Sequence, residues 1–219
     1  MGIRFFGACG APVVPRRVVS FQSVAIAALF AAALFLLPQI AQAQFVQQGD
    51  KLLGGGASGS AEQGTSVAVS ADGNTALVGG PADSSGTGAV WVYTRDSSNG
   101  TWAQQGSKLV GNGLTLTANE GSSVALSADG NTAIFGGPLA TPDPGFDNVG
   151  IGGVWVFTRD SNGTWTQQSS MLIGVGAMGV AAQGTSVALS ADGNTAIAGG
   201  PADNFSFSFG PFGPIGDGA

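Results

Sequence analysis

The sequence contains no histidine and a single cysteine, Cys9. The lack of histidine excludes Ser–His–Asp and Cys–His nucleophile systems, since both need an imidazole base. It also removes the usual ligand of zinc and copper sites. Any catalysis by this chain must therefore depend on its carboxylates, its one tyrosine and its two lysines.

Charged residues are also scarce. They make up 9% of the chain, against about 25% in an average globular domain. Glycine, in contrast, supplies 38 of 219 residues, more than twice its usual share of about 7%. With 43% hydrophobic residues, the chain is too apolar for disorder driven by charge. This composition predicts short strands joined by many tight turns.

Residues 1–43 follow the order of a secretory signal peptide. A basic segment without acidic residues precedes an apolar run that is densest from Val24 to Leu37, and Ala41-Gln42-Ala43 has the small-x-small pattern of a cleavage site. We expect cleavage after Ala43 and export to the periplasm, the cell surface or the medium. Arg16-Arg17 leaves a twin-arginine route open beside the general secretory one. The alternative is an uncleaved anchor, because residues 18–37 are just long enough to span a bilayer.

Removal of the signal peptide leaves an acidic chain without cysteine. Residues 44–219 keep four basic side chains against all 13 acidic ones, a net charge of −9. A chain with so few cations cannot neutralise phosphates, which argues against nucleic acid as a partner. No disulfide can form, so stability must come from burial and backbone pairing.

An internal repeat runs through the rest of the chain. QGTSVAVSADGNTA at 63–76 returns as EGSSVALSADGNTA at 120–133 and as QGTSVALSADGNTA at 183–196. Gly-Gly-Pro follows at 79–81, 136–138 and 199–201, and Val-Trp-Val at 90–92 and 154–156. The extra length of the second unit lies in one loop, as stacked repeats allow. We therefore divide residues 44–203 into units at about 54–110, 111–173 and an incomplete 174–203, followed by a Phe/Gly/Pro-rich tail at 204–219.

Each unit is predicted to form four antiparallel strands. In the first unit they are expected at 66–70, 75–78, 89–94 and 101–110, because apolar and small polar residues alternate there with a period of two. Asp72-Gly73 and Asn99-Gly100 supply tight hairpin turns between them. No amphipathic helix follows the signal peptide. The fold class is therefore all-β, with units that must bury their apolar faces on one another.

The repeat resembles FG-GAP repeats, the blades of the β-propeller at the N-terminus of integrin α chains and of many secreted bacterial proteins. Ser66-Val67-Ala68, Gly79-Gly80-Pro81 and the strand 88–93 match the family's motifs in order, over roughly residues 45–203. The resemblance implies a partial β-propeller of about three blades. It departs from the family at Gln63, Glu120 and Gln183, which replace an aromatic residue, and in lacking the Asp-x-Asp-x-Asp-Gly calcium loops.

The predicted strands are too few for a closed propeller, which has typically 4–8 blades. Phe45–Leu53 is expected to add a leading strand, and the alternating phenylalanines from Phe205 to Phe209 a substitute for the missing third strand of the last unit. The arc would still have two open edges, which favour pairing with other chains. We expect either self-association through these edges or a truncated gene product.

The candidate metal ligands lie in the repeated turns. Three acid–amide pairs could offer oxygen ligands to calcium: Asp72 and Asn74, Asp129 and Asn131, and Asp192 and Asn194. Asp143 and Asp147 of the long loop are further candidates. Calcium takes 6–8 oxygen ligands, and a site with one carboxylate binds weakly. The turn aspartates are better explained by the backbone preference for Asp before Gly, so no cofactor is expected beyond this calcium possibility.

Two basic and four aromatic residues complete the candidates. Arg95 and Arg159, each followed by Asp, are predicted to form solvated strand ends, because exposed ion pairs contribute little. The four tryptophans recur at fixed positions, which favours a core between blades over a binding face for sugars or peptides. They are Trp91, Trp102, Trp155 and Trp165.

These observations favour an exported, non-enzymatic propeller module that binds another macromolecule or surface, an inference that depends partly on the family resemblance. Two alternatives stay open. The chain could be a truncated repeat protein without activity of its own. It could also be a propeller hydrolase or lyase that uses the carboxylates of Asp72, Asp129 and Asp192, provided that these meet at one cleft.

Overall fold

The structure is a computed structural model that describes residues 46–113, 117–141, 150–177, 180–202 and 207–209. The chain divides into two units, Met1–Gln47 and Gln48–Ala219, and every element below belongs to the second. The predicted signal peptide lies outside the described residues. Within the described ranges, no helix is long and apolar enough to cross a membrane.

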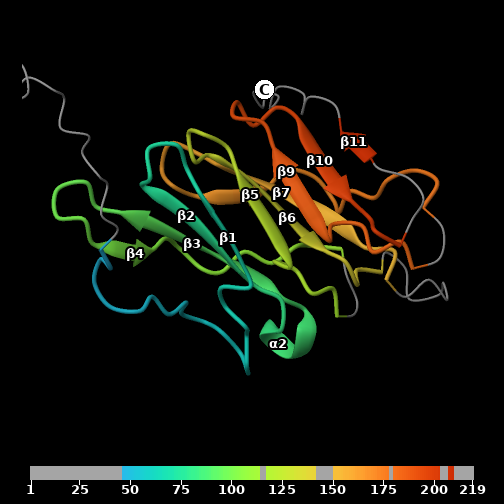
Figure 1. The fold of residues 1–219 in the computed structure, drawn as a ribbon, viewed down its shortest axis with the longest axis horizontal. Helices are drawn as coiled ribbons and strands as arrows, with labels where there is room; N and C mark the ends of the chain where they lie inside the picture. The colour runs from blue at the N-terminus through green and yellow to red at the C-terminus, as the bar shows by residue number, and fades with distance from the viewer. Residues whose placement is uncertain (1–45, 114–116, 142–149, 178–179, 203–206, 210–219) are drawn as a thin grey trace, which may run out of the picture. The chain divides into compact units, whose positions relative to one another are not determined.

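The first sheet contains four antiparallel strands in the order β1-β2-β3-β4 (Figure 1). They are β1 (Ser66–Val69), β2 (Thr75–Gly80), β3 (Ala89–Arg95) and β4 (Trp102–Gln104). A single helical turn, α2 (Asp83–Gly86), lies between β2 and β3. Here Asp83, fully buried, forms an ion pair with Lys108.

The second sheet repeats the first, and the third is a shorter version. The second contains β5 (Ser123–Leu126), β6 (Thr132–Gly137), β7 (Gly153–Arg159) and β8 (Trp165–Gln167) in the same order. The third contains β9 (Ser186–Leu189), β10 (Ala196–Gly199) and β11 (Phe207–Phe209), ordered β11-β10-β9. The prediction of an all-β chain with antiparallel four-stranded sheets is confirmed.

The repeated Asp-Gly-Asn turn joins the first two strands of each sheet. At Asp72 the carboxylate accepts hydrogen bonds from the Ser70 hydroxyl (2.5 Å) and the Asn74 amide (3.0 Å). Gly73 between them has φ +69°, a conformation that glycine adopts without strain. The same bonds recur around Asp129 and Asp192, so the turns form from local chemistry alone.

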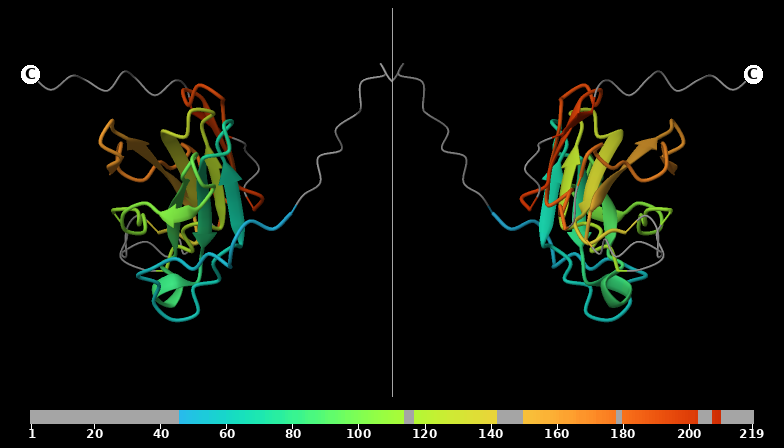
Figure 2. Two further views of the ribbon diagram at one scale, coloured as in Figure 1. Left: turned by 90° about the vertical axis from the view of Figure 1, so that its left-hand side faces the viewer. Right: turned by 90° about the vertical axis from the view of Figure 1, so that its right-hand side faces the viewer.

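The three sheets stack face to face through their first strands, β1 against β5 and β5 against β9 (Figures 1 and 2). Backbone bonds connect the adjacent turns: the Ala71 N–H donates to the Ala128 carbonyl (2.9 Å), and the Ala128 N–H to the Ala191 carbonyl (2.8 Å). Glycine makes the approach possible, because a Cβ at Gly79 would lie 2.1 Å from the carbonyl oxygen of Gly121. The stack is thus held by backbone contacts as well as by apolar packing.

Two apolar cores lie between the sheets, and a third lies on the outer side of the first sheet. Leu77, Val90 and Val92 of the first sheet pack against buried Phe135 and Trp155 of the second. Ile134, Val154 and Val156 on the other side of the second sheet pack against Ala196 and Ala198 of the third. The outer core holds Trp91 and Tyr93 with Ala61, beneath the segment that carries Gly55, whose carbonyl accepts a bond from the Trp91 indole (2.9 Å).

The structure corrects two predicted strands and confirms a third. The fourth strand of the first unit covers only Trp102–Gln104. After a bond from the Gln105 N–H to the Val92 carbonyl (2.8 Å), the chain leaves the sheet edge and returns for a bridge between Leu109 and Val90. The described part of the predicted leading strand, residues 46–53, is not a strand. The substitute strand predicted in the phenylalanine-rich segment is confirmed by β11, which pairs with β10.

Candidate functional site

The three turn carboxylates each belong to their own turn. Hydrogen bonds from Ser70 and Asn74 lower the pKa of Asp72, and the equivalent bonds lower that of Asp192. Burial raises the pKa of Asp129, but bonds from Ser127 and Asn131 outweigh it, so this pKa is lowered too. The turns are adjacent, yet each aspartate is ionised and accepts hydrogen bonds from residues of its own turn.

The described residues include no group of three or more acidic, cysteine or histidine side chains that could hold a metal ion. In two of the three calcium candidates the amide oxygen already has a basic partner: Asn74 Oδ1 accepts a bond from Arg95 (3.5 Å) and Asn131 Oδ1 one from Arg159 (3.0 Å). Asn194 contributes a backbone N–H to Asp192 (3.1 Å). Asp143 and Asp147 lie outside the described residues.

The prediction that Arg159 is a solvated strand end is wrong. Its guanidinium is half-buried and crosses between the first two sheets, donating to Gln105 Oε1 (3.1 Å) and Thr75 Oγ1 (3.3 Å). It also lies 5.4 Å from the centre of the Trp165 ring, within cation–π range. Sequence adjacency to an aspartate gave no sign of these partners, which come from another sheet.

Arg95 occupies the equivalent place in the first sheet and has few partners. Among the described residues its side chain makes one hydrogen bond, the long one to Asn74 Oδ1 (3.5 Å), and its Nε is buried without a partner. A buried donor without an acceptor costs free energy. The Arg95 guanidinium therefore keeps N–H donors that no described acceptor uses.

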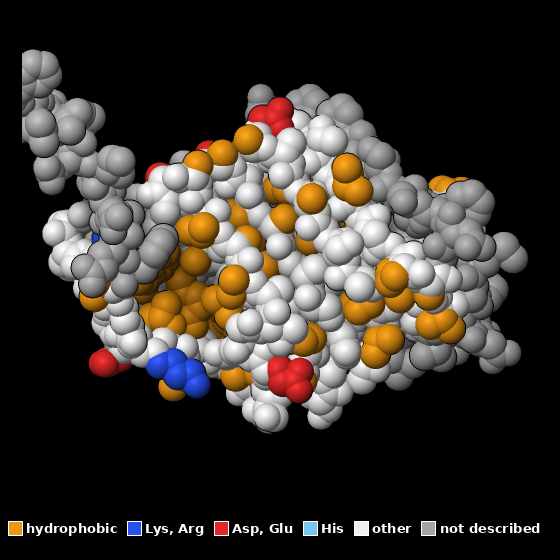
Figure 3. Space-filling model, in the orientation of Figure 1, with side chains coloured by type: hydrophobic (Ala, Val, Ile, Leu, Met, Phe, Trp, Pro, Cys, Tyr) orange, Lys and Arg blue, Asp and Glu red, His pale blue; other side chains and the backbone are white. Residues whose placement is uncertain are grey.

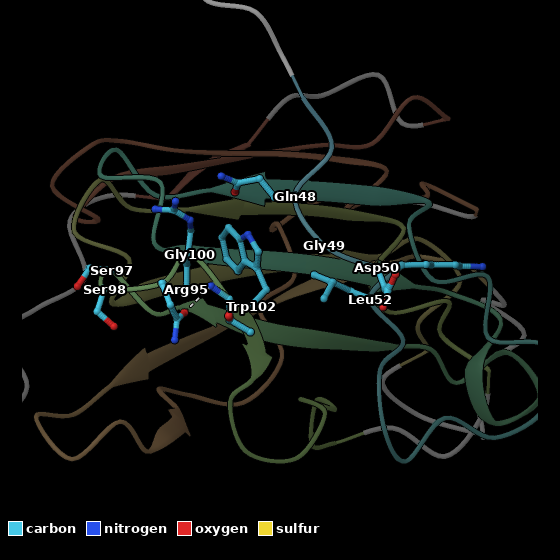
Figure 4. A pocket seen from close by; sticks show the side chains of 12 residues that line it. Gln48, Gly49, Asp50, Leu52, Arg95, Ser97, Ser98, Gly100 and Trp102 are labelled. Carbon is cyan, nitrogen blue, oxygen red and sulfur yellow. Dashed lines mark hydrogen bonds between the residues drawn. The ribbon is translucent and has the colours of Figure 1, made fainter.

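A groove of about 760 Å³ lies beside Arg95. Residues 48–52 line one side, and Arg95 with residues 97–102 the other. Figure 4 shows Trp102 next to Arg95, with Asp50 and Leu52 on the segment that passes the groove. The groove thus combines a guanidinium, an indole ring, a carboxylate and the hydroxyls of Ser97 and Ser98. Sequence reasoning missed it, since residues 46–53 were expected to be a strand.

Glu120 is the described carboxyl with the most perturbed pKa, which burial raises to about 8. Such a shift often marks a functional residue. Here the repeat gives a structural explanation, because Gln63 and Gln183 occupy the same position in the other two units. Each of the three side chains accepts a hydrogen bond from a backbone N–H: Gln63 from Gly54, Glu120 from Gly111 and Gln183 from Gly174. Glu120 is fully buried and does not line the groove, so we assign it to the core.

The predicted tryptophan core is confirmed for the tryptophans of β3 and β7. Trp91 and Trp155 are fully buried, and Trp155 stacks on Phe135 with ring centres 5.8 Å apart. Trp102 and Trp165 are only half-buried. Trp102 is the one that lines the groove, so the four residues divide between packing and a potential binding surface.

No family model and no curated protein matches this chain. Solved structures match at 15% sequence identity: a candidate 6-phosphogluconolactonase from Bacteroides uniformis, with a TM-score of 0.45 over 68% of this chain, and the periplasmic gluconolactonase PpgL from Pseudomonas aeruginosa, with a TM-score of 0.40 over 67%. The chain spans 39% of the length of each.

These comparisons correct the FG-GAP and integrin-like assignment. The matching structures are described as lactonases, and no FG-GAP model matches. The main functional expectation, a non-enzymatic binding module, is corrected with it, because the matched proteins bear the names of enzymes.

Proposed function

We propose that this chain is part of an exported hydrolase of the β-propeller type, and that the groove beside Arg95 binds a small polyhydroxylated ester or lactone. The observation that carries the proposal is the groove itself, where the Arg95 guanidinium, with one long side-chain hydrogen bond among the described residues, lies beside an indole ring. The three stacked sheets would be blades of the propeller. Export is supported by the order of segments in residues 1–43.

The size and lining of the groove suit such a substrate. Its volume of about 760 Å³ lies within the range of about 300–1,000 Å³ that is usual for small-molecule sites. The Trp102 ring offers an apolar surface to the C–H face of a sugar-like ring. Arg95 offers N–H donors to a carbonyl oxygen, where negative charge develops when water adds.

Asp50 is the candidate base. It is the carboxylate that lines the groove, and none of the groove residues is a histidine. In the proposed reaction Asp50 takes a proton from water as the oxygen adds to the ester carbonyl. The acyl–oxygen bond then breaks, and the proton passes to the leaving alkoxide, which yields a hydroxy acid. The turn carboxylates, which are used within their own loops, take no part.

The first experiment is a pH-indicator assay of lactone hydrolysis by the purified chain. Glucono-δ-lactone is the first substrate, chosen from the compounds that the matched proteins are named for, and the assay is run with calcium and with a chelator because the turn oxygens remain calcium candidates. We expect hydrolysis above the buffer rate, and a loss of at least about 100-fold in Asp50→Asn, the usual size of a general-base effect.

Asp192→Asn is the matched control, since Asp192 is an exposed turn carboxylate away from the groove. Trp102→Ala is expected to raise KM more than it lowers kcat, whereas Arg95→Met, which removes donors to the developing oxyanion, should mainly lower kcat. If a panel of aldonolactones and simple esters is hydrolysed no faster than in buffer, the hydrolase proposal fails, and the truncated, inactive repeat protein becomes the better interpretation.

A further inference from the structure

The two interfaces between sheets are copies of one another. In the first, Ala68 and Leu77 of the first sheet pack in the core that also receives Val124 and Leu126 of the second. In the second, the equivalent Ala125 and Ile134 pack in the core that receives Val187 and Leu189 of the third. One arrangement of side chains is therefore used twice along the stack.

The same two faces recur, uncovered, at the two ends of the stack. We call Val67 and Val69 the near face; they correspond to Val124 and Leu126 but are 68% and 60% exposed. We call Ala188 and Ile197 the far face; they correspond to Ala68 and Leu77, and Ile197 is 52% exposed where Leu77 is fully buried. Apolar side chains gather on the surface over β1 and its neighbours (Figure 3).

Polar groups at the far face continue the pattern. The Ser66 hydroxyl donates to the Gly121 carbonyl (2.7 Å), and the Ser123 hydroxyl to the Gly184 carbonyl (2.7 Å). The next residue in this series, Ser186, has no such bond among the described residues. By the repeat, its acceptor would be the carbonyl of Gly64 at the near face.

The space beside the glycines at the two ends of the stack is also open for another sheet. A Cβ at Gly79 or Gly136 would lie 2.1 or 1.9 Å from the carbonyl oxygen of the next sheet, whereas a Cβ at Gly199 would meet only Ser186 of its own sheet. Likewise a Cβ at Gly193 would lie 2.8 Å from Thr132 Oγ1, but one at the equivalent Gly73 meets nothing within 4 Å. Both ends of the stack have the clearance that the internal interfaces use.

We propose that the far face of one copy of this chain docks on the near face of a second copy, head to tail, as a third use of the internal interface. The contact is made by sheet faces, with Ile197 and Ala188 of one copy against Val67 and Val69 of the other. Such a heterologous contact forms a closed ring if the rotation allows and an open chain of copies if it does not.

The test is the mass of the purified chain, measured by light scattering and sedimentation as a function of concentration. We expect dimers or longer assemblies. Val67→Asp and Ile197→Asp should each weaken association at least 100-fold, because either places a carboxylate in the contact. Val175→Asp, at a turn valine that is 97% exposed, is the matched control and should associate like the wild type.

A mixture of the two variants gives the decisive result. Each variant keeps one intact face, so a 1:1 mixture of Val67→Asp and Ile197→Asp should form a complex that neither forms alone. Gly199→Ala is a second route, because within the fold the methyl group meets only the Ser186 hydroxyl, 2.5 Å away, which can rotate aside, while it removes the clearance at the contact. This variant should be monomeric and melt close to the wild type. A wild type that is monomeric at all concentrations, loss of association in Val67→Asp but not in Ile197→Asp, or a mixture that stays monomeric would each overturn the proposal.

Discussion

The first and second sheets are alike in sequence and backbone and differ in what covers them. Their strands have the same lengths of 4, 6, 7 and 3 residues, and the same turns connect the first two strands. The second sheet has a neighbour on both faces, whereas the first has a sheet on one face and only a loop segment on part of the other. The strand pattern is thus a local property, while burial and partners at a given repeat position depend on the neighbour.

The buried tryptophans of β3 and β7 give the strongest test of this difference. Trp155→Ala removes an indole that packs between two sheets and stacks on Phe135, and should cost about 5 kcal/mol of unfolding free energy, the upper end for such a change. Trp91→Ala should cost about 3 kcal/mol, because the segment over it can collapse into the space. Urea unfolding of both variants measures the difference. Equal losses would mean that the loop packs as rigidly as a sheet.

Glu120 distinguishes the second sheet electrostatically. With a folded pKa of about 8 against an ordinary 4.5, the folded state binds the proton more tightly, so stability from this group is complete below pH 4.5 and falls as the pH rises to 8, by about 1.4 kcal/mol per pH unit. Glu120→Gln, which restores the residue found at positions 63 and 183, should remove that slope.

The measurement is the urea midpoint between pH 4.5 and 8. The variant should match the wild type at the acid end and be clearly more stable at pH 8. Glu62→Gln, at an exposed position before Gln63, which corresponds to Glu120 in the first unit, is the control and should leave the difference between acid and neutral pH unchanged. A wild-type profile that Glu120→Gln does not alter would show that the carboxyl is ionised in the fold.

Two equivalent glycines, Gly136 and Gly199, test the close approach of backbones, with a smaller expected change in unfolding free energy. Gly136→Ala would place a methyl group 1.9 Å from the carbonyl oxygen of Gly184 and should cost about 1–3 kcal/mol, as overpacking does. Gly199→Ala, at the same position of the third sheet, should cost less in the isolated chain, because the methyl group would displace only the Ser186 hydroxyl, 2.5 Å away. Thermal unfolding at a concentration where the chain is monomeric separates the two.

The strands and turns were predictable because the information is local. Alternation in Ser66-Val67-Ala68-Val69 and the turn at Asp72-Gly73 give strand and hairpin without any partner. The partners of Arg159, the burial of Glu120 and the groove beside Arg95 were not predictable, since each depends on a segment far away in sequence. The FG-GAP motifs misled for the same reason: Ser-Val-Ala and Gly-Gly-Pro describe strand alternation and close sheet approach, which other stacked sheets need as well.

Substitution of the equivalent arginines Arg95 and Arg159 should give the smallest difference in unfolding free energy between the two sheets. Arg159→Met removes bonds to Gln105, Thr75 and Asn131 and a contact with Trp165, and should cost about 1–2 kcal/mol, since the group is partly solvated and its bonds are to neutral acceptors. Arg95→Met should change unfolding free energy by less than about 0.5 kcal/mol, as for a surface change, because Arg95 has one long bond and an unpartnered Nε. Urea unfolding of the two variants at low protein concentration is the measurement. An equal loss of unfolding free energy in Arg95→Met and Arg159→Met would mean that the first sheet already has a partner on its open face. Measuring both variants over a range of protein concentrations then shows whether that partner binds at this face.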